Sequence, residues 1–311
     1  MRHDAIIIGG SFAGLSAALY IARARRSACI VDTGLPRNRF APHSHGFFGQ
    51  DGSEPAAMLA TAHTQVAAYP TATFVEDKAV KAAKAADVFS VELATGEVFE
   101  CSRLVLAFGV SDELPGIPGL AERWGKSVLH CPYCHGYEFS GRRLGVLNVS
   151  PMSVQQAMLI AEWGPTTFYL NGTSMTESAA LPPPAGGSWS GQDALAELER
   201  RGVAIEPAPV TALHGEGDGL SAIELGDGRM SPADALYIGP RFRLNSRIAE
   251  QLGCEMDEAP LGRIIRTDEQ KATTVPGVYA AGDITRGAHT VTWACADGVM
   301  AGLAVHRSLV F

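Results

Sequence analysis

A glycine-rich turn near the N-terminus, Gly9-Gly-Ser-Phe-Ala-Gly14, constrains the fold of this chain more than any other sequence feature. Residues 5–9 form a β-branched run typical of a strand, and residues 13–26 are typical of a helix. Residues 28–32 predict a second strand that ends in an acid, Asp32. A glycine motif alone is weak, but this one stands in a complete strand-turn-helix-strand unit. The unit predicts a doubly wound α/β fold with a dinucleotide site at the turn.

Each position of the turn has a physical reason. Gly9 permits a tight turn, and Gly14 lets the helix pack against the strand. The free N–H groups of the helix N-terminus carry a partial positive charge that favours a pyrophosphate. Ser11 stands where glycine is usual, and it is the smallest side chain that still allows a ligand to approach. Asp32 is placed to accept hydrogen bonds from ribose hydroxyls.

The rest of the chain repeats this organisation once. A long loop rich in Pro, His and Gly covers residues 36–53, and a Pro/Gly linker covers residues 114–120. Further elements are predicted in the ranges 54–68, 73–75, 89–93, 104–108, 144–149, 153–163, 167–170, 233–239, 278–283 and 291–309, with a loop at 181–187. Two β-α-β units predict two doubly wound, Rossmann-like domains. We expect residues 1–113 and 246–311 to form one discontinuous domain, into which residues 114–245 are inserted.

Composition excludes several classes of partner. The net charge of -8 and the low pI of about 5.6 argue against nucleic acid and against anionic membranes. No apolar run approaches the ~20 residues that a membrane span needs. The N-terminus leads directly into a strand without a cleavage site, so we expect a cytoplasmic protein.

The pair Cys131-Pro-Tyr-Cys134 is the second chemical feature of the sequence. This spacing lets the two sulfurs meet, and a helix that starts near Cys134 would lower a thiol pKa. His130 and His135 flank the pair and could assist proton transfer. Half of a zinc site is the alternative, but it needs a second pair of ligands and the sequence offers none closely spaced. An inert buried pair is a further alternative. We therefore predict a redox-active pair and no metal.

These features together resemble the low-molecular-weight thioredoxin reductases over nearly the whole chain. The resemblance rests on the N-terminal turn, the mid-chain cysteine pair and the run Gly277-Val-Tyr-Ala-Ala-Gly-Asp283. It implies an FAD cofactor, a homodimer, Cys134 beside the flavin and Cys131 exchanging with substrate. Asp283 would bind the ribityl chain, and the helix after Thr290 would point at the flavin pyrimidine edge. The predicted FAD-binding residues are Gly9, Ser11, Phe12, Ala13, Gly14, Asp32, Gly282, Asp283, Thr290 and Val291.

The second nucleotide turn departs from the reductases. In that family the inserted domain holds NADPH with a glycine-rich turn and a basic cluster for the 2′-phosphate. Here the turn reads Asn148-Val-Ser-Pro-Met-Ser153, without glycine, and Pro151 has no N–H to donate. The strand end at residues 168–175 contains no Arg, Lys or His. We therefore expect a domain that keeps the fold and has lost the ligand.

The cysteine motif departs from the reductases as well. His135 stands where they have an aspartate, and residues 131–138 are similar to the gliotoxin and holomycin dithiol oxidases. By that likeness His135 is a candidate general base, and Glu138 either orients it or is a solvated surface acid. The sequence thus predicts an FAD-dependent dithiol oxidase that uses oxygen and releases peroxide. The alternatives are an NAD(P)H-dependent thioredoxin or disulfide reductase and a redox sensor without turnover. Small dithiols or disulfides and a thioredoxin-like protein all fit as substrates.

Overall fold

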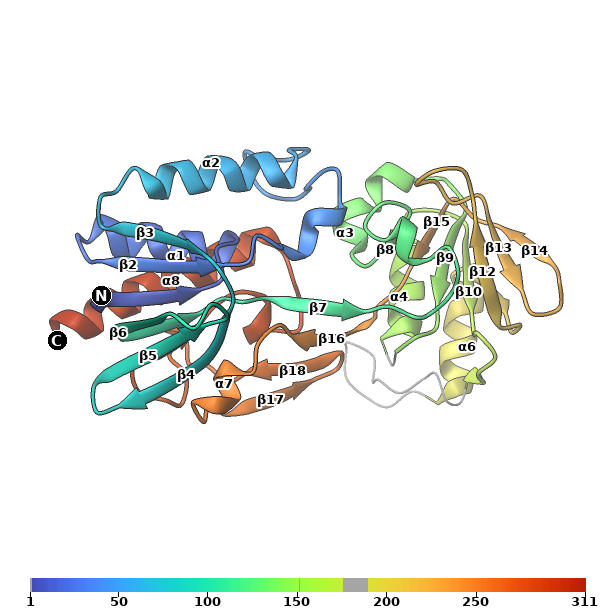
Figure 1. The fold of residues 1–311 in the computed structure, drawn as a ribbon. Helices are drawn as coiled ribbons and strands as arrows, with labels where there is room; N and C mark the ends of the chain where they lie inside the picture. The colour runs from blue at the N-terminus through green and yellow to red at the C-terminus, as the bar shows by residue number, and fades with distance from the viewer. Residues whose placement is uncertain (1, 151, 176–189) are drawn as a thin grey trace. The chain divides into compact units, whose positions relative to one another are not determined.

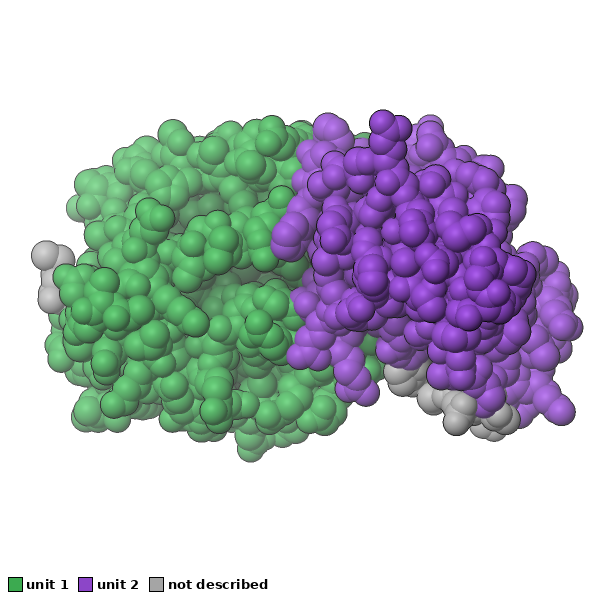
Figure 2. Space-filling view, turned by 45° about the vertical axis from the view of Figure 1, so that its right-hand side comes forward, with its two compact units in different colours: residues 1–39, 47–111, 242–311 green, residues 40–46, 112–241 purple. Residues whose placement is uncertain are grey.

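The computed structural model describes residues 2–150, 152–175 and 190–311, so Pro151 and the loop predicted at 181–187 lie outside the described residues. The chain divides into two compact units, drawn in two colours in Figure 2. The first unit contains Met1–Arg39, Phe47–Ser111 and Phe242–Phe311. The second contains Phe40–Gly46 and Asp112–Arg241. Both units are built on parallel α/β sheets, which confirms the predicted fold class.

The sheet of the first unit has the strand order β3-β2-β1-β6-β5-β4, with β19 also paired to β6 (Figure 1). Strands β1, β2, β3, β6 and β19 pair in parallel, and β4, β5 and β6 pair antiparallel. The bounds are β1 (Arg2–Ile8), β2 (Ala28–Asp32), β3 (Ala72–Glu76), β4 (Ala79–Ala85), β5 (Val88–Leu93), β6 (Val98–Leu106) and β19 (Val278–Ala280). Strand β1, which is buried from Ala5 to Ile8, lies between β2 and β6, with Ile6 beside both Cys29 and Leu104. The carboxyl end of β1 therefore lies at the middle of the sheet, where open α/β sheets bind ligands.

Three long helices belong to this unit: α1 (Phe12–Arg23), α2 (Pro55–Ala67) and α8 (Val291–Val310). Helices α1 and α8 lie side by side and in close contact. Only glycine fits at position 298, since a Cβ there would collide with the carbonyl oxygen of Ala13. Their small residues form one core cluster with the buried Ile7 and Val105 of the sheet. The remaining elements of the unit are η1 (Arg37–Phe40), α7 (Ile248–Gln251), the hairpin β17 (Met256–Ala259) and β18 (Gly262–Ile265), and η4 (Asp283–Thr285). Close α1–α8 packing fixes both helix N-termini relative to the sheet.

The second unit holds a parallel sheet of order β11-β10-β9-β15-β8 and an antiparallel sheet of order β12-β13-β14. The strand bounds are β8 (Val128–Leu129), β9 (Leu144–Leu147), β10 (Thr166–Tyr169), β11 (Ala204–Glu206), β12 (Val210–His214), β13 (Ala222–Leu225), β14 (Met230–Pro232) and β15 (Ala235–Tyr237). The helices are η2 (Ala121–Arg123), α3 (Pro132–His135), η3 (Tyr137–Phe139), α4 (Ser153–Ile160) and α6 (Gly191–Arg200). Strand β7 (Val110–Glu113) pairs with β16 (Arg241–Leu244) where the chain passes between units.

Alternating side chains divide the core of the second unit into two layers. Val146 and Tyr237 on one face of the parallel sheet pack with α4 and α6. Leu147 and Leu236 on the other face pack with the antiparallel sheet β12–β14. Because β8 pairs in parallel with β15, the cysteine loop that follows β8 lies at the carboxyl edge of the parallel sheet. No helix in the described part of the chain is long and apolar enough to span a membrane.

Candidate active site

The turn between β1 and α1 is as tight as the sequence predicts. Gly9 has φ +111°, and a Cβ there would collide with the carbonyl oxygen of Ala107. A Cβ at Gly14 would collide with the carbonyl oxygen of Gly9, so α1 starts directly against the turn. Ser11 is the N-cap of α1, and its side chain makes no capping hydrogen bond. The first-turn N–H groups of α1 are therefore left for a ligand, and they fit a pyrophosphate.

The carboxylate of Asp32 braces this turn. Its Oδ1 accepts from the Gly10 N–H at 2.9 Å, and its Oδ2 accepts from the Gly34 N–H at 3.2 Å. An ionised carboxylate offers about four acceptor positions, so two remain for ribose hydroxyls. Asp32 thus has a structural task that the motif alone does not indicate, and binding of ribose by this residue stays a prediction.

The second half of the predicted FAD site surrounds Asp283. Gly282 before it has φ +83°, and Asp283 starts the short helix η4. The Oδ2 of Asp283 accepts from the Arg37 guanidinium at 3.0 Å, and the same nitrogen of Arg37 lies 2.6 Å from Nδ1 of His289. Thr290 is the N-cap of α8 and accepts from the Trp293 N–H at 3.1 Å. Sequence reasoning missed Arg37, because its loop contains no recognisable motif.

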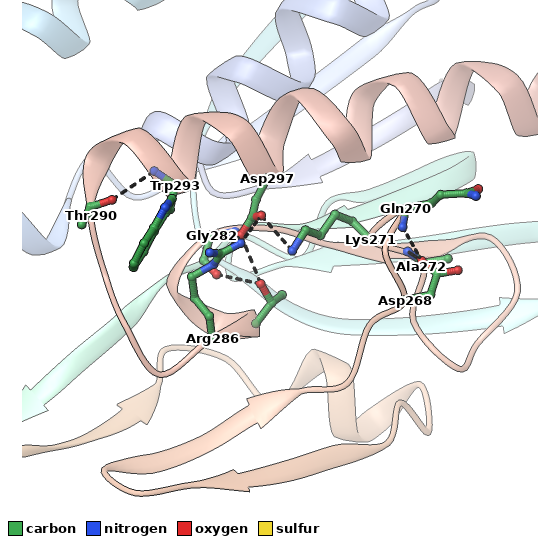
Figure 3. Close-up of polar contacts among 10 residues, drawn as sticks. Asp268, Gln270, Lys271, Ala272, Gly282, Arg286, Thr290, Trp293 and Asp297 are labelled. Carbon is green, nitrogen blue, oxygen red and sulfur yellow. Dashed lines mark hydrogen bonds and ion pairs between the residues drawn. The ribbon is translucent and has the colours of Figure 1, made fainter. Parts of the chain in front are cut away.

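A buried carboxylate, Asp297, holds the loop before α8 in place (Figure 3). It is 2 % exposed and pairs with Lys271 at 2.8 Å and with both ends of the Arg286 guanidinium at 2.5 and 3.0 Å. The Gly282 N–H and the Thr285 hydroxyl also point at its Oδ2, each at 3.3 Å. Sequence reasoning missed this cluster, although an acid within the small-residue run Ala296-Asp297-Gly298 was a usable signal. The cluster fixes the Gly282–Asp283 turn against α8.

We expect Asp297→Ala to lower the free energy of unfolding by about 3–5 kcal/mol, because it leaves the partly buried cations Lys271 and Arg286 without their buried carboxylate. Thermal or denaturant unfolding measures this loss. Asp257→Ala is the matched control, since the Asp257–Arg266 pair is about half exposed and surface pairs contribute at most about 1 kcal/mol. An Asp297→Ala loss no larger than that of the control would contradict the role given to the cluster.

The cysteine pair follows β8 and forms a disulfide, with the two Cα atoms 5.3 Å apart. The sequence predicts a helix that begins near Cys134, and helix α3 begins two residues before it. Helix α3 begins at Pro132, because proline is favoured at the first helical position, where no N–H is needed. The helix contains four residues. Cys131 is therefore the N-cap, and its sulfur accepts from the Cys134 N–H at 3.2 Å.

The two flanking histidines have different surroundings. Nδ1 of His130 lies 3.2 Å from the carbonyl oxygen of Ile238, and its own carbonyl accepts from the Gln156 amide at 2.9 Å. These contacts anchor the loop before Cys131 to β15 and α4. Burial lowers the pKa of His135 below its ordinary value of 6.5, Glu138 opposes this, and His45 adds to it. His135 is therefore a neutral imidazole at pH 7 and can accept a proton.

Glu138 lies next to a residue that sequence reasoning missed. Its Oε1 is 3.5 Å from Nε2 of His45, which comes from the loop segment of the second unit. The ring of His45 meets that of His135 edge-on, with centroids 6.2 Å apart. Among the described residues, no group of three or more His, Cys, Asp or Glu side chains is arranged to hold a metal ion.

In the second nucleotide turn, a side chain of the turn itself accepts hydrogen bonds from the backbone amides. The hydroxyl of Ser153, at the start of α4, accepts from the N–H groups of Val149 and Ser150 at 3.1 and 3.2 Å. These are amides that a glycine-rich turn would offer to a phosphate. The Asn171 side chain after β10 accepts from the Val210 N–H at 2.9 Å. Two amides of the described turn are thus used internally, whereas the buried Ser150 hydroxyl has no hydrogen-bond partner among the described residues.

The fold and the site define a protein of two α/β units, the second of which carries the Cys131–Cys134 disulfide. The chain belongs to the pyridine nucleotide-disulphide oxidoreductase family, whose family model matches residues 3–298. It is a flavin-dependent thiol-disulfide oxidoreductase, and its cofactor is FAD.

Three similar proteins cover nearly the whole chain. Thioredoxin reductase tcpT of Claviceps purpurea is 34% identical over 285 residues, which cover 90% of this chain and 86% of that protein. The solved structure of an oxidoreductase from Agrobacterium tumefaciens is 44% identical, has a TM-score of 0.90, and is matched over 100% of this chain and 99% of that one. The structure of HlmI is 35% identical, with a TM-score of 0.89 and coverage of 99% and 93%. The predicted resemblance is confirmed.

Proposed function

We propose that this protein is an FAD-dependent dithiol oxidase that forms a disulfide in a small dithiol. Molecular oxygen would be the electron acceptor and hydrogen peroxide the product. The observation that carries the proposal is the second nucleotide turn, where the Ser153 hydroxyl takes the amides that NADPH would need. A dithiol that reduces Cys131–Cys134 directly would make a nicotinamide cofactor unnecessary.

The proposed FAD site combines the three features of the first unit described above. The pyrophosphate would lie at the N-terminus of α1, Asp32 would bind ribose, and Asp283 with the N-terminus of α8 would hold the flavin end. FAD supplies a two-electron acceptor that oxygen can reoxidise. The residues proposed to hold it are Gly9, Ser11, Phe12, Ala13, Gly14, Asp32, Gly282, Asp283, Thr290 and Val291.

The chain's own residues would carry out the thiol chemistry. His135 takes the proton of the first substrate thiol, and the thiolate attacks Cys131. A substrate–Cys131 disulfide forms while the Cys131–Cys134 bond breaks, with its electron pair going to the Cys134 sulfur. The second substrate thiol then attacks the substrate sulfur of this mixed disulfide and forms the product disulfide. Cys131 leaves as a thiol, having taken the proton of the second substrate thiol. The substrate is oxidised by two electrons, the cysteine pair is reduced, and His135 retains the other proton.

We expect His135→Ala to slow reduction of the cysteine pair by dithiothreitol by about 10²–10⁴-fold, the contribution typical of a positioned base. Stopped-flow kinetics on FAD-loaded protein measures the rate, and flavin content should be unchanged. His214→Ala, which removes an exposed histidine from β12, is the control. A slowing of less than about threefold would make His135 a packing residue.

The names of relatives favour a thioredoxin reductase as the second candidate. Oxygen consumption with dithiothreitol as the only electron donor tests the oxidase directly. Steady uptake with peroxide release supports it, whereas a single stoichiometric reduction would indicate a redox sensor instead.

We also propose a homodimer, a cytoplasmic location and possible exchange with a thioredoxin-like protein. The exposed face of α8 supports a second copy as partner, since it carries Trp293, Met300, Leu303 and Val310, each at least 41% exposed.

A further inference from the structure

The loop segment Phe40–Gly46 belongs to the second unit, although most of its sequence neighbours belong to the first. It packs at Gly125, where a Cβ would lie 2.9 Å from the Phe40 Cβ. This packing brings His45 to the cysteine loop, far from it in sequence. The side chain of His45 is only 21% exposed, so its contacts there are largely shielded from water.

His45 and Glu138 form one pair at the edge of the cysteine loop. Nε2 of His45 lies 3.5 Å from Oε1 of Glu138, and its ring is perpendicular to that of His135 at 6.2 Å. Glu138 thus contacts the imidazole of His45, and it also raises the pKa of His135, the residue that follows Cys134 directly. At this separation the imidazole and the carboxylate are in direct contact and restrict each other's position.

The charged and titratable groups around His135 come from three elements. Glu138 lies on η3, and His45 lies on the loop segment Phe40–Gly46. The ring centroids of His43 and His45 are 6.4 Å apart. Tyr237 on β15 donates from its hydroxyl to the His135 carbonyl at 3.4 Å. Burial raises the pKa of Tyr237, so this phenol stays neutral at working pH. His45 and Glu138 are then the two groups that act on the pKa of His135 in opposite directions.

We propose that His45 is a positioning residue for the His135 proton acceptor, and that it acts by holding the Glu138 carboxylate. This proposal rests on the proposed function, in which His135 takes the proton of the attacking substrate thiol. Glu138 alone would favour the imidazolium form of His135 and so lower the share of neutral imidazole that can accept a proton. His45 acts on the pKa of His135 in the opposite direction, and its contact with Glu138 holds the carboxylate in place.

The test compares His45→Gln, Glu138→Gln and His214→Gln in the FAD-loaded protein. Histidine ring signals give the pKa of His135 by NMR, and alkylation after rapid quenching gives the rate of disulfide reduction by dithiothreitol against pH. The rate rises with pH as His135 loses its proton. His45→Gln should raise the pKa of His135, because the lowering effect of His45 on that imidazole is removed, and should slow reduction by up to about tenfold below that pKa.

Glu138→Gln should move the pKa of His135 in the opposite direction, downward, since an opposite charge is removed. His214→Gln removes the histidine of another His–Glu pair, His214–Glu224 at 2.7 Å, and should change neither readout. Melting temperatures check that each variant is folded. An unchanged His135 titration and pH profile in His45→Gln would overturn the role of His45, even if His135→Ala is slow. Wild-type kinetics in His135→Ala would instead overturn the proposed function of His135 as the proton acceptor, on which the role of His45 rests.

Discussion

Replacing either Cys131 or Cys134 with serine should abolish dithiol turnover, because a single thiol cannot complete the exchange. This is the largest effect that we expect from any single substitution. The two cysteines lie in one short loop and form one disulfide, so removing either sulfur removes the electron path. Cys295→Ser is the matched control, because Cys295 is a half-buried free thiol of α8 outside the disulfide. It should retain turnover.

The same two variants separate the roles of the sulfurs. By the role that the family resemblance implies for Cys134, Cys131→Ser should show a long-wavelength absorbance band from a Cys134 thiolate, whereas Cys134→Ser should show none. Absorbance spectra of the purified variants measure this. A band in Cys134→Ser alone would reverse the roles proposed for the two cysteines, and substantial turnover in either variant would exclude the disulfide mechanism.

Gly14→Val should remove most of the FAD, with an affinity at least about tenfold lower. The first side-chain carbon at this position already collides with the Gly9 carbonyl oxygen, so α1 must move away from the turn that binds the pyrophosphate. Overpacking of this kind costs about 1–3 kcal/mol or more, and about 1.4 kcal/mol corresponds to tenfold in affinity.

The ratio of flavin to protein absorbance after purification measures this effect. Gly116→Val is the matched control, because a Cβ at Gly116 has no neighbour within 4 Å. Full flavin content in both variants would place the FAD site elsewhere, whereas equal loss in both would point to a general folding defect.

Local sequence patterns predict the elements that are buried and regular. The β2 strand has the predicted bounds, because a buried apolar run ends at an acid and a turn. The strand β4, Ala-Val-Lys-Ala-Ala-Lys-Ala, was not predicted, since alanine and lysine favour helices. Its pairing with β5 decides its structure. Helix α6 was also missed, although Ser190 and Asp193 form a capping box that signals its start.

The candidate site shows the same division. The turn at Gly9–Gly14 and the cysteine pair are local in sequence, so their patterns carry the prediction. Arg37, His45 and Asp297 act through partners that tertiary folding brings to them, and only the fold identifies those partners. Helix α3 begins at Pro132 rather than at Cys134, because proline is favoured at the first helical position.

The most direct test of the central claim compares two electron donors under anaerobic conditions. Because Ser153 takes the amides of the second turn and no basic residue ends the following strand, the usual charge-assisted contacts to NADPH are missing. Losing several such contacts, at about 1.5–3 kcal/mol each, raises a dissociation constant by orders of magnitude. We predict that dithiothreitol bleaches the flavin and that air restores its colour with release of peroxide, whereas NADPH and NADH leave the flavin oxidised. Rapid bleaching by either nicotinamide would contradict the oxidase and establish a reductase.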